Sequence, residues 1–181
     1  MNTENILKLF GYYKSLGERT FAVLSDEELH LEPATDANSI SIIVKHLWGN
    51  MLSRWTNFLT EDGEKDWRNR DEEFEVTIKT RKELTEKWEE GWNCLFQAIG
   101  NLKESDFERT IYIRNEGQSV TDAIHRQLAH YSYHIGQIVF LGKLIKGEEW
   151  ESLSIPKGES KSYNTDKFSA EKTERHFTDK V

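Results

Sequence analysis

Apolar side chains return every three or four residues through four long segments of this chain. That interval places them on one face of an α-helix, so each segment is expected to be a helix with one buried stripe. Four such helices can cover their stripes by packing side by side, which predicts an all-α four-helix bundle. The four segments comprise residues 3–24, 39–59, 76–102 and, starting near Ser119 or Thr121, the stretch up to Lys146.

The connections between these segments carry two further signals. Residues 60–75 are too polar for a core element but contain Trp67 and Phe74, which we expect to anchor an ordered loop. Before the last helix, "DFERTIYIRNEGQSVT" alternates and contains the turn signal "RNEGQ" with Gly117, which predicts a short β-hairpin. Both connections are long enough to cross over the bundle.

The chain of 181 residues is most simply one domain, which we place at residues 1–160. Residues 161–181 are polar and are expected to form a C-terminal tail. The start of the chain lacks the pattern of a signal peptide, and no apolar run approaches the roughly 18 residues that span a membrane. The single cysteine, Cys94, excludes an intramolecular disulfide and a cysteine-rich zinc module. These features favour a cytoplasmic protein without a membrane partner.

The formal net charge of −8 argues against a nucleic-acid partner. Phosphate binding depends on clustered Lys and Arg side chains that release counterions, and an acidic chain lacks a broad basic surface. A small-molecule substrate or a protein partner remains compatible with this charge.

The stretch "RQLAHYSYHIGQI", residues 126–138, places His130 and His134 four residues apart on one helical face. Two imidazoles at this spacing can bind one metal ion, although the motif alone is weak. The alternative is a pair of boundary histidines that hydrogen-bond to neighbouring groups. His46 is the best candidate for a third ligand, at the edge of the apolar face of its helix. His125 lies roughly 140° around the helix from His130 and is therefore excluded.

Few other residues stand out as chemical groups, and none can be assigned a catalytic role. Gln137, one turn beyond His134, could support a histidine, whereas Tyr133 is expected to point elsewhere. Cys94 has no histidine near it in sequence and is interpreted as a partly buried thiol. A further set could line a pocket or simply keep the long loop solvated, and the second interpretation is favoured for it: Arg68, Arg70 and Asp71.

The sequence resembles the DinB/YfiT-like superfamily of metal-binding four-helix bundles, and within it an uncharacterised Bacillus-type branch. The resemblance covers roughly residues 5–165. It rests on "SIIVKHLWGNMLSRWTNFLTEDGEKDWRNRDEEFE", "RQLAHYSYHIGQIVFLGK" and "LSIPKGES". The resemblance implies a three-histidine metal centre formed by His46, His130 and His134. It also implies helices in up-down-down-up order, a homodimer, and a divalent ion such as zinc or nickel.

Members of this superfamily with assigned activities are transferases and isomerases that use low-molecular-weight thiols such as bacillithiol. The resemblance therefore suggests a metal-dependent thiol S-transferase, with metal-dependent hydrolysis as a close variant. An open position on a three-histidine ion could activate a thiol or a water molecule. The alternative from another class is a non-catalytic, metal-stabilised dimeric bundle that acts as a binding or structural module.

Overall fold

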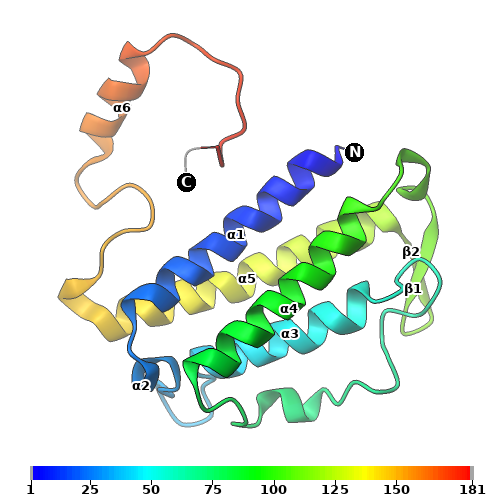
Figure 1. Cartoon of the computed structure of the whole chain (residues 1–181). Coiled ribbons are helices and arrows are strands. Elements are labelled where there is room, and N and C mark those ends of the chain that lie inside the picture. The colour runs from blue at the N-terminus through cyan, green and yellow to red at the C-terminus, as the bar shows by residue number, and fades with distance from the viewer. Residues whose placement is uncertain (1, 180–181) are drawn as a thin grey trace.

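The computed structural model describes residues 2–179. Met1 of the expected domain and residues 180–181 of the expected tail lie outside the described residues. The described part is mostly helical, with six α-helices and a small two-stranded antiparallel sheet (Figure 1). All four predicted helices and the predicted hairpin are present.

The four long helices are α1 (Thr3–Val23), α3 (Ile40–Trp55), α4 (Arg81–Gly100) and α5 (Val120–Lys146). Helix α1 packs against α4 and α5, and α3 packs against the same two helices. Helices α1 and α5 run in one direction, whereas α3 and α4 run in the opposite one (Figure 1). The apolar stripes meet in one shared core, whose fully buried side chains include Phe10, Leu47, Trp92 and Tyr131.

Capping residues decide where two of these helices begin and end, and they correct the predicted bounds. Helix α4 was expected from residue 76 but begins after Thr80, whose hydroxyl accepts from the Glu83 N–H in a capping box. The extended residues before it still bury Ile78, so an apolar side chain there does not require a helix. Helix α3 was expected up to residue 59 but ends at Trp55, because the chain turns at Asn57 (φ 49°).

The hairpin pairs β1 (Thr110–Ile113) with β2 (Glu116–Ser119). Its turn consists of Arg114 and Asn115, both at positive φ (56° and 60°), as a two-residue type I′ turn requires. Placing Gly117 in the turn was wrong, because this residue lies in β2 opposite Tyr112. Asp62 accepts hydrogen bonds from both turn N–H groups, at 2.8 and 2.9 Å, and so ties the long loop to the hairpin.

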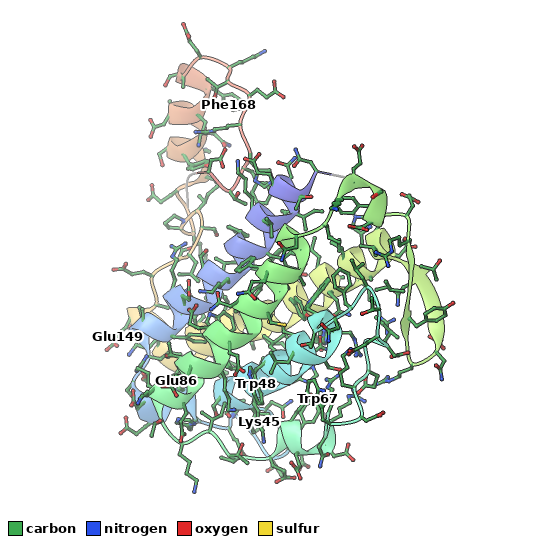
Figure 2. The ribbon with its side chains drawn as sticks, turned by 45° about the vertical axis from the view of Figure 1, so that its right-hand side comes forward. Lys45, Trp48, Trp67, Glu86, Glu149 and Phe168 are labelled. Atoms are coloured by element: carbon green, nitrogen blue, oxygen red, sulfur yellow. The ribbon has the colours of Figure 1, made fainter. Side chains whose placement is uncertain are left out.

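Polar contacts and one aromatic contact hold the loop between α3 and α4. Trp67 is 60% exposed, so the expectation that it anchors the loop is wrong (Figure 2). Phe74 is partly exposed but stacks on His46, with ring centroids 5.1 Å apart. The loop contains one 3₁₀ turn, η1 (Asp71–Phe74), and Lys45 of α3 donates to two of its backbone carbonyls. The loop is thereby held against α3.

The remaining elements are short. Helix α2 (Asp26–Leu29) lies in the first connection. The 3₁₀ turn η2 (Glu104–Asp106) precedes the hairpin, and the 3₁₀ turn η3 (Gly147–Glu149) follows α5. Helix α6 (Ser160–Ser169) lies in the segment expected as a tail and buries none of its residues. Phe168 of α6, labelled in Figure 2, is 86% exposed. Among the described residues, no helix is long and apolar enough to cross a membrane.

Candidate metal centre

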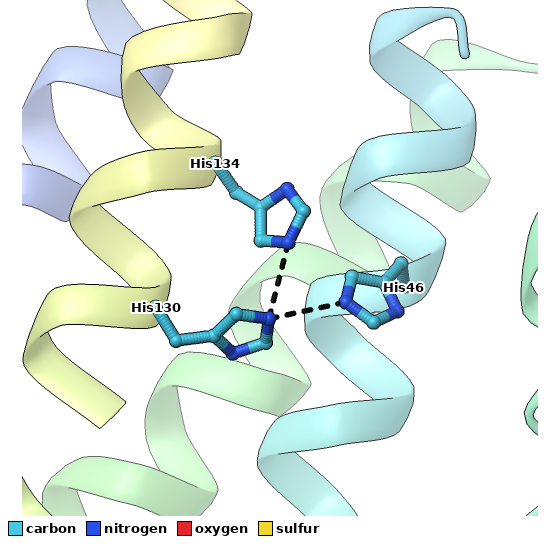
Figure 3. A group of neighbouring side chains, drawn as sticks. All are labelled: His46, His130 and His134. Atoms are coloured by element: carbon cyan, nitrogen blue, oxygen red, sulfur yellow. Dashed lines mark hydrogen bonds between the residues drawn. The ribbon is translucent and has the colours of Figure 1, made fainter. Parts of the chain in front are cut away.

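The structure brings together the three histidines predicted as ligands (Figure 3). His46 comes from α3, and His130 and His134 come from successive turns of α5. The Nε2 atom of His130 lies 3.3 Å from Nε2 of His46 and 3.1 Å from Nε2 of His134. One ligand atom from each ring lies within 4.8 Å of the others. Three ring nitrogens therefore face one small region between the two helices.

Two of the rings are oriented by hydrogen bonds at their other nitrogen. His46 Nδ1 lies 2.9 Å from the Glu73 carboxylate, which only accepts, and His134 Nδ1 lies 2.7 Å from Gln137 Oε1. Both rings thus carry their proton on Nδ1 and direct an Nε2 lone pair inward. A proton on Nε2 of His130 can point at only one of these two lone pairs, so the remaining nitrogen contact is repulsive unless a cation lies among the rings. A tetrahedral zinc ion with bonds of about 2.0–2.1 Å separates its ligand nitrogens by roughly 3.3 Å, which matches the two separations from His130 Nε2, while the ligand atoms of all three rings lie within 4.8 Å of one another.

Burial keeps two of these rings neutral. The pKa of His130 falls to about 3 because its ring is desolvated and is repelled by the charged forms of His134 and His46. The pKa of His134 is also lowered, mainly by burial, although its hydrogen bond to Gln137 opposes the shift. Neutral imidazole is the form that binds a metal ion, so these rings are ready to bind at pH 7.

Glu73 is the group that sequence reasoning missed. Only 4% of its surface is exposed, and Arg68 donates to both carboxylate oxygens, at 2.7 and 2.9 Å. Burial alone would raise the Glu73 pKa, but the hydrogen bonds from His46 and Arg68 outweigh it and lower this pKa. The carboxylate therefore stays charged, which strengthens His46 as a ligand.

A glycine makes room for this carboxylate. Gly49 lies one turn after His46 on α3, and a Cβ atom added there would come within 2.9 Å of Glu73 Cδ. Such a contact is too short for carbon atoms, so any larger residue would displace the carboxylate from His46. The close approach of the loop to α3 thus depends on the missing side chain at this position.

The residues around the triad agree only partly with the sequence analysis. Gln137 bonds His134 as expected, and Tyr133 points outward but accepts a hydrogen bond from the Gln137 amide (3.2 Å). Arg68 was assigned to a solvated loop, which is wrong, because its side chain is only 2% exposed. Arg70 lines a cavity beside the triad, whereas Asp71 is exposed.

Two candidates set aside by the sequence analysis lie apart from the triad. His125 is exposed on the outer face of α5, as its angle predicted. Cys94 is partly buried on α4, where burial raises the pKa of its thiol. Its one sulfur contact is to the Thr56 hydroxyl at 3.7 Å. A thiol with a raised pKa is a poor nucleophile, so the interpretation of Cys94 as an inert group agrees with its surroundings.

Comparison with known proteins gives one match. The model of a family described as "Protein of unknown function (DUF1572)" matches residues 3–159, which include all three histidines. No curated protein matches the chain. No solved structure matches it either.

Proposed function

Because the chain belongs to the DUF1572 family, whose function is unknown, we propose its function from the site itself: His46, His130 and His134 hold one divalent metal ion. The observation that carries this proposal is the convergence of three Nε2 atoms while Glu73 and Gln137 occupy Nδ1 of two rings. A proton on Nε2 of His130 could bond only one of the other two Nε2 atoms, so hydrogen bonding among the rings does not account for the convergence of all three. Zinc and nickel suit three neutral imidazoles best.

We further propose that the four long helices form a bundle of the DinB/YfiT-like kind and that the protein acts as a homodimer. The opposed directions of α1 with α5 and of α3 with α4 support up-down-down-up order (Figure 1). The sequence resemblance around His46 and His130 supports the superfamily. Sedimentation velocity at several concentrations tests the dimer, and a monomer at all of them would refute it.

The reaction we propose is the transfer of a low-molecular-weight thiol, of the bacillithiol type, to an electrophilic small molecule. A divalent ion with an open position lowers the pKa of a thiol or a water molecule, so that a nucleophile exists at neutral pH. The chain's own contribution is to keep His130 and His134 neutral by burial and to orient two of the rings: Glu73 orients His46, and Gln137 orients His134. Hydrolysis of an electrophile by an activated water molecule is the close variant.

The alternative is that the metal only stabilises the fold of a binding module. The buried Arg68–Glu73 ion pair favours this function to a degree, since it joins the loop to α3 through the same His46. A structural ion normally has four protein ligands, however, whereas three histidines leave a position open. We therefore place the enzymatic proposal first.

Elemental analysis after reconstitution with zinc or nickel tests the metal site. The wild type and a His125→Ala control are expected to hold one ion per chain, whereas His130→Ala is expected to lose it. Absence of stoichiometric metal from the wild type would refute the site. If His130→Ala loses the metal but keeps its melting temperature, a purely structural ion is excluded.

A thiol-transfer screen with bacillithiol and a chlorinated aromatic acceptor then tests whether the protein is an enzyme or a non-catalytic binding module. Turnover by the metal-loaded wild type and the His125→Ala control, with none by His130→Ala, is the expected result. Metal-loaded protein that turns over neither this pair nor a hydrolysable ester, together with unfolding on metal removal, would support the structural alternative.

A further inference from the structure

A cavity of about 200 Å³ lies directly beside the candidate metal centre, with His46 and His130 in its wall. Among the described residues, its lining contains no aspartate or glutamate. The residues that dominate the lining are five arginines: Arg54, Arg68, Arg70, Arg114 and Arg126. On a chain of net charge −8, five arginines around one cavity create a local positive potential that attracts anions.

The carboxylates that touch these arginines do not neutralise them. Glu64 lies between three of the guanidinium groups, at 3.0 Å from Arg54, 3.4 Å from Arg68 and 3.1 Å from Arg114. Glu73 adds the second carboxylate, on Arg68. Five guanidinium charges against two carboxylates leave a surplus of three positive charges at the cavity.

Two of the five arginines are available to a ligand. Within residues 2–179, the side chains of Arg70 and Arg126 make no ion pair or hydrogen bond, and both are exposed at the cavity. They come from different elements, the loop before η1 and helix α5, so they approach the cavity from two sides. A guanidinium group is suited to bind the two oxygens of an oxyanion, and two of them can hold one from both sides.

Buried groups in the same wall also lack a partner within the described part of the chain. Gln127 is 3% exposed, and its Oε1 atom accepts no hydrogen bond. Arg54 is 7% exposed, and its Nε–H group donates none. Both atoms are covered by protein, so they make the wall polar, while direct contacts to an occupant fall to the exposed guanidinium groups of Arg70 and Arg126.

We infer that this cavity binds the oxyanion of a small ligand, a carboxylate or a phosphate, whose other end reaches the histidine triad. A volume of about 200 Å³ has room for roughly six or seven water molecules of about 30 Å³ each, and so for a ligand with a similar number of non-hydrogen atoms. Larger molecules would place only their anionic end there. As a statement about the substrate class, the inference rests on the proposed function; the anion site itself rests on the arginines.

Isothermal titration of zinc-loaded protein at fixed ionic strength tests the inference with matched probes. 3-Mercaptopropionate carries a thiol and a carboxylate, whereas 2-mercaptoethanol carries a thiol and an uncharged hydroxyl group. The wild type is expected to bind the first about tenfold more tightly, since a charge-assisted hydrogen bond contributes at least that factor. Competition with propionate and with inorganic phosphate identifies the preferred oxyanion, and displacement by neither would refute the anion site.

The double variant Arg70→Ala/Arg126→Ala is expected to lose the tenfold preference while its affinity for 2-mercaptoethanol stays unchanged. Its control, Lys172→Ala/Arg175→Ala, removes two positive charges from the exposed C-terminal segment and should behave like the wild type. Melting temperatures verify that both variants are folded. Equal binding of the two thiols by the wild type, or an unchanged preference in the arginine variant, would overturn the inference.

The two proposals fail in distinguishable ways. If the wild type takes up no zinc, the proposed function fails. The anion site is then judged on the metal-free protein. There, propionate or phosphate must bind the wild type and the lysine–arginine control about tenfold more tightly than the Arg70→Ala/Arg126→Ala variant, and equal affinities would refute it.

Discussion

Replacing Glu73 by glutamine tests whether the loop carboxylate supports both the fold and the triad. The change keeps the volume of the side chain but removes its charge, and the new NH₂ group faces a donor from His46 or Arg68. Arg68, with 2% of its side chain exposed, would keep a single ion pair, its 3.4 Å contact to Glu64. The buried guanidinium group would thus lose its main counter-charge.

The expected cost follows from this burial. Breaking a buried ion pair by removing one partner costs about 3–5 kcal/mol, and the retained carbonyl oxygen recovers part of it, so we expect about 3 kcal/mol in the metal-free protein. For a chain of this size, 1 kcal/mol corresponds to about 2–4 °C, which predicts a melting temperature about 6–12 °C lower. Loss of the hydrogen bond that orients His46 should also weaken zinc binding about 10- to 100-fold.

Urea denaturation in the presence of a chelator measures the first effect, and zinc competition with a chromogenic chelator measures the second. The control is Glu72→Gln, a neighbouring change whose side chain is exposed. If Glu73→Gln is as stable as Glu72→Gln within about 0.5 kcal/mol and binds zinc equally well, the role assigned to Glu73 is wrong.

Four further changes test the site and its surroundings. Gly136→Ala should stabilise the protein by about 1 kcal/mol, because nothing lies within 4 Å of the added Cβ. Gly49→Ala should instead destabilise the protein and weaken zinc binding, because the added Cβ displaces Glu73. Urea denaturation measures both changes in the free energy of unfolding, which should have opposite signs. Tyr131→Phe should cost about 2 kcal/mol with zinc stoichiometry retained, because the buried hydroxyl joins two hydrogen bonds of 3.0 Å; an unchanged unfolding midpoint would contradict this. The His130 pKa of about 3 lies below the unfolded value of 6.5, so the folded state binds fewer protons between these values and stability falls as the pH drops below about 6.5. After allowance for partial solvent exposure, we expect this ring to cost roughly 2–3 kcal/mol at pH 4 in metal-free protein, and His130→Gln should show an acid sensitivity smaller by that amount.

We expect the arginine-lined cavity and the histidine triad to contact different ends of one ligand. The triad would act on the reactive end of a small molecule, while the arginines select for its anionic end. Arg68 belongs to both, because it lines the cavity and also bonds the carboxylate that orients His46. Replacing Arg68 would therefore disturb metal binding and ligand binding at once, which is why the test above uses Arg70 and Arg126.

Local physical chemistry accounts for what could be predicted from the sequence. The 3.6-residue period identifies the long helices, and a spacing of four puts His130 and His134 on one face wherever that helix packs. The first and last residues of each helix are harder to predict from the sequence, because capping decides them. The apolar residues before Thr80 resemble a continuing helical stripe, yet the capping box starts α4 only at Arg81.

Tertiary structure alone decided which polar residues matter. Glu73 lies in the acidic run "DEEFE", and its neighbours Asp71, Glu72 and Glu75 are exposed while it is buried against His46. No local pattern separates it from them, because the distinction arises from where the loop meets α3. Likewise, the periodicity of α3 placed His46 only at the edge of the interior. The packing of α3 beside α5 brought its Nε2 atom to 3.3 Å from that of His130. The sequence determined which histidines could share a face of one helix. Contacts between segments far apart in the chain determined their convergence, their orientation and their arginine-rich surroundings.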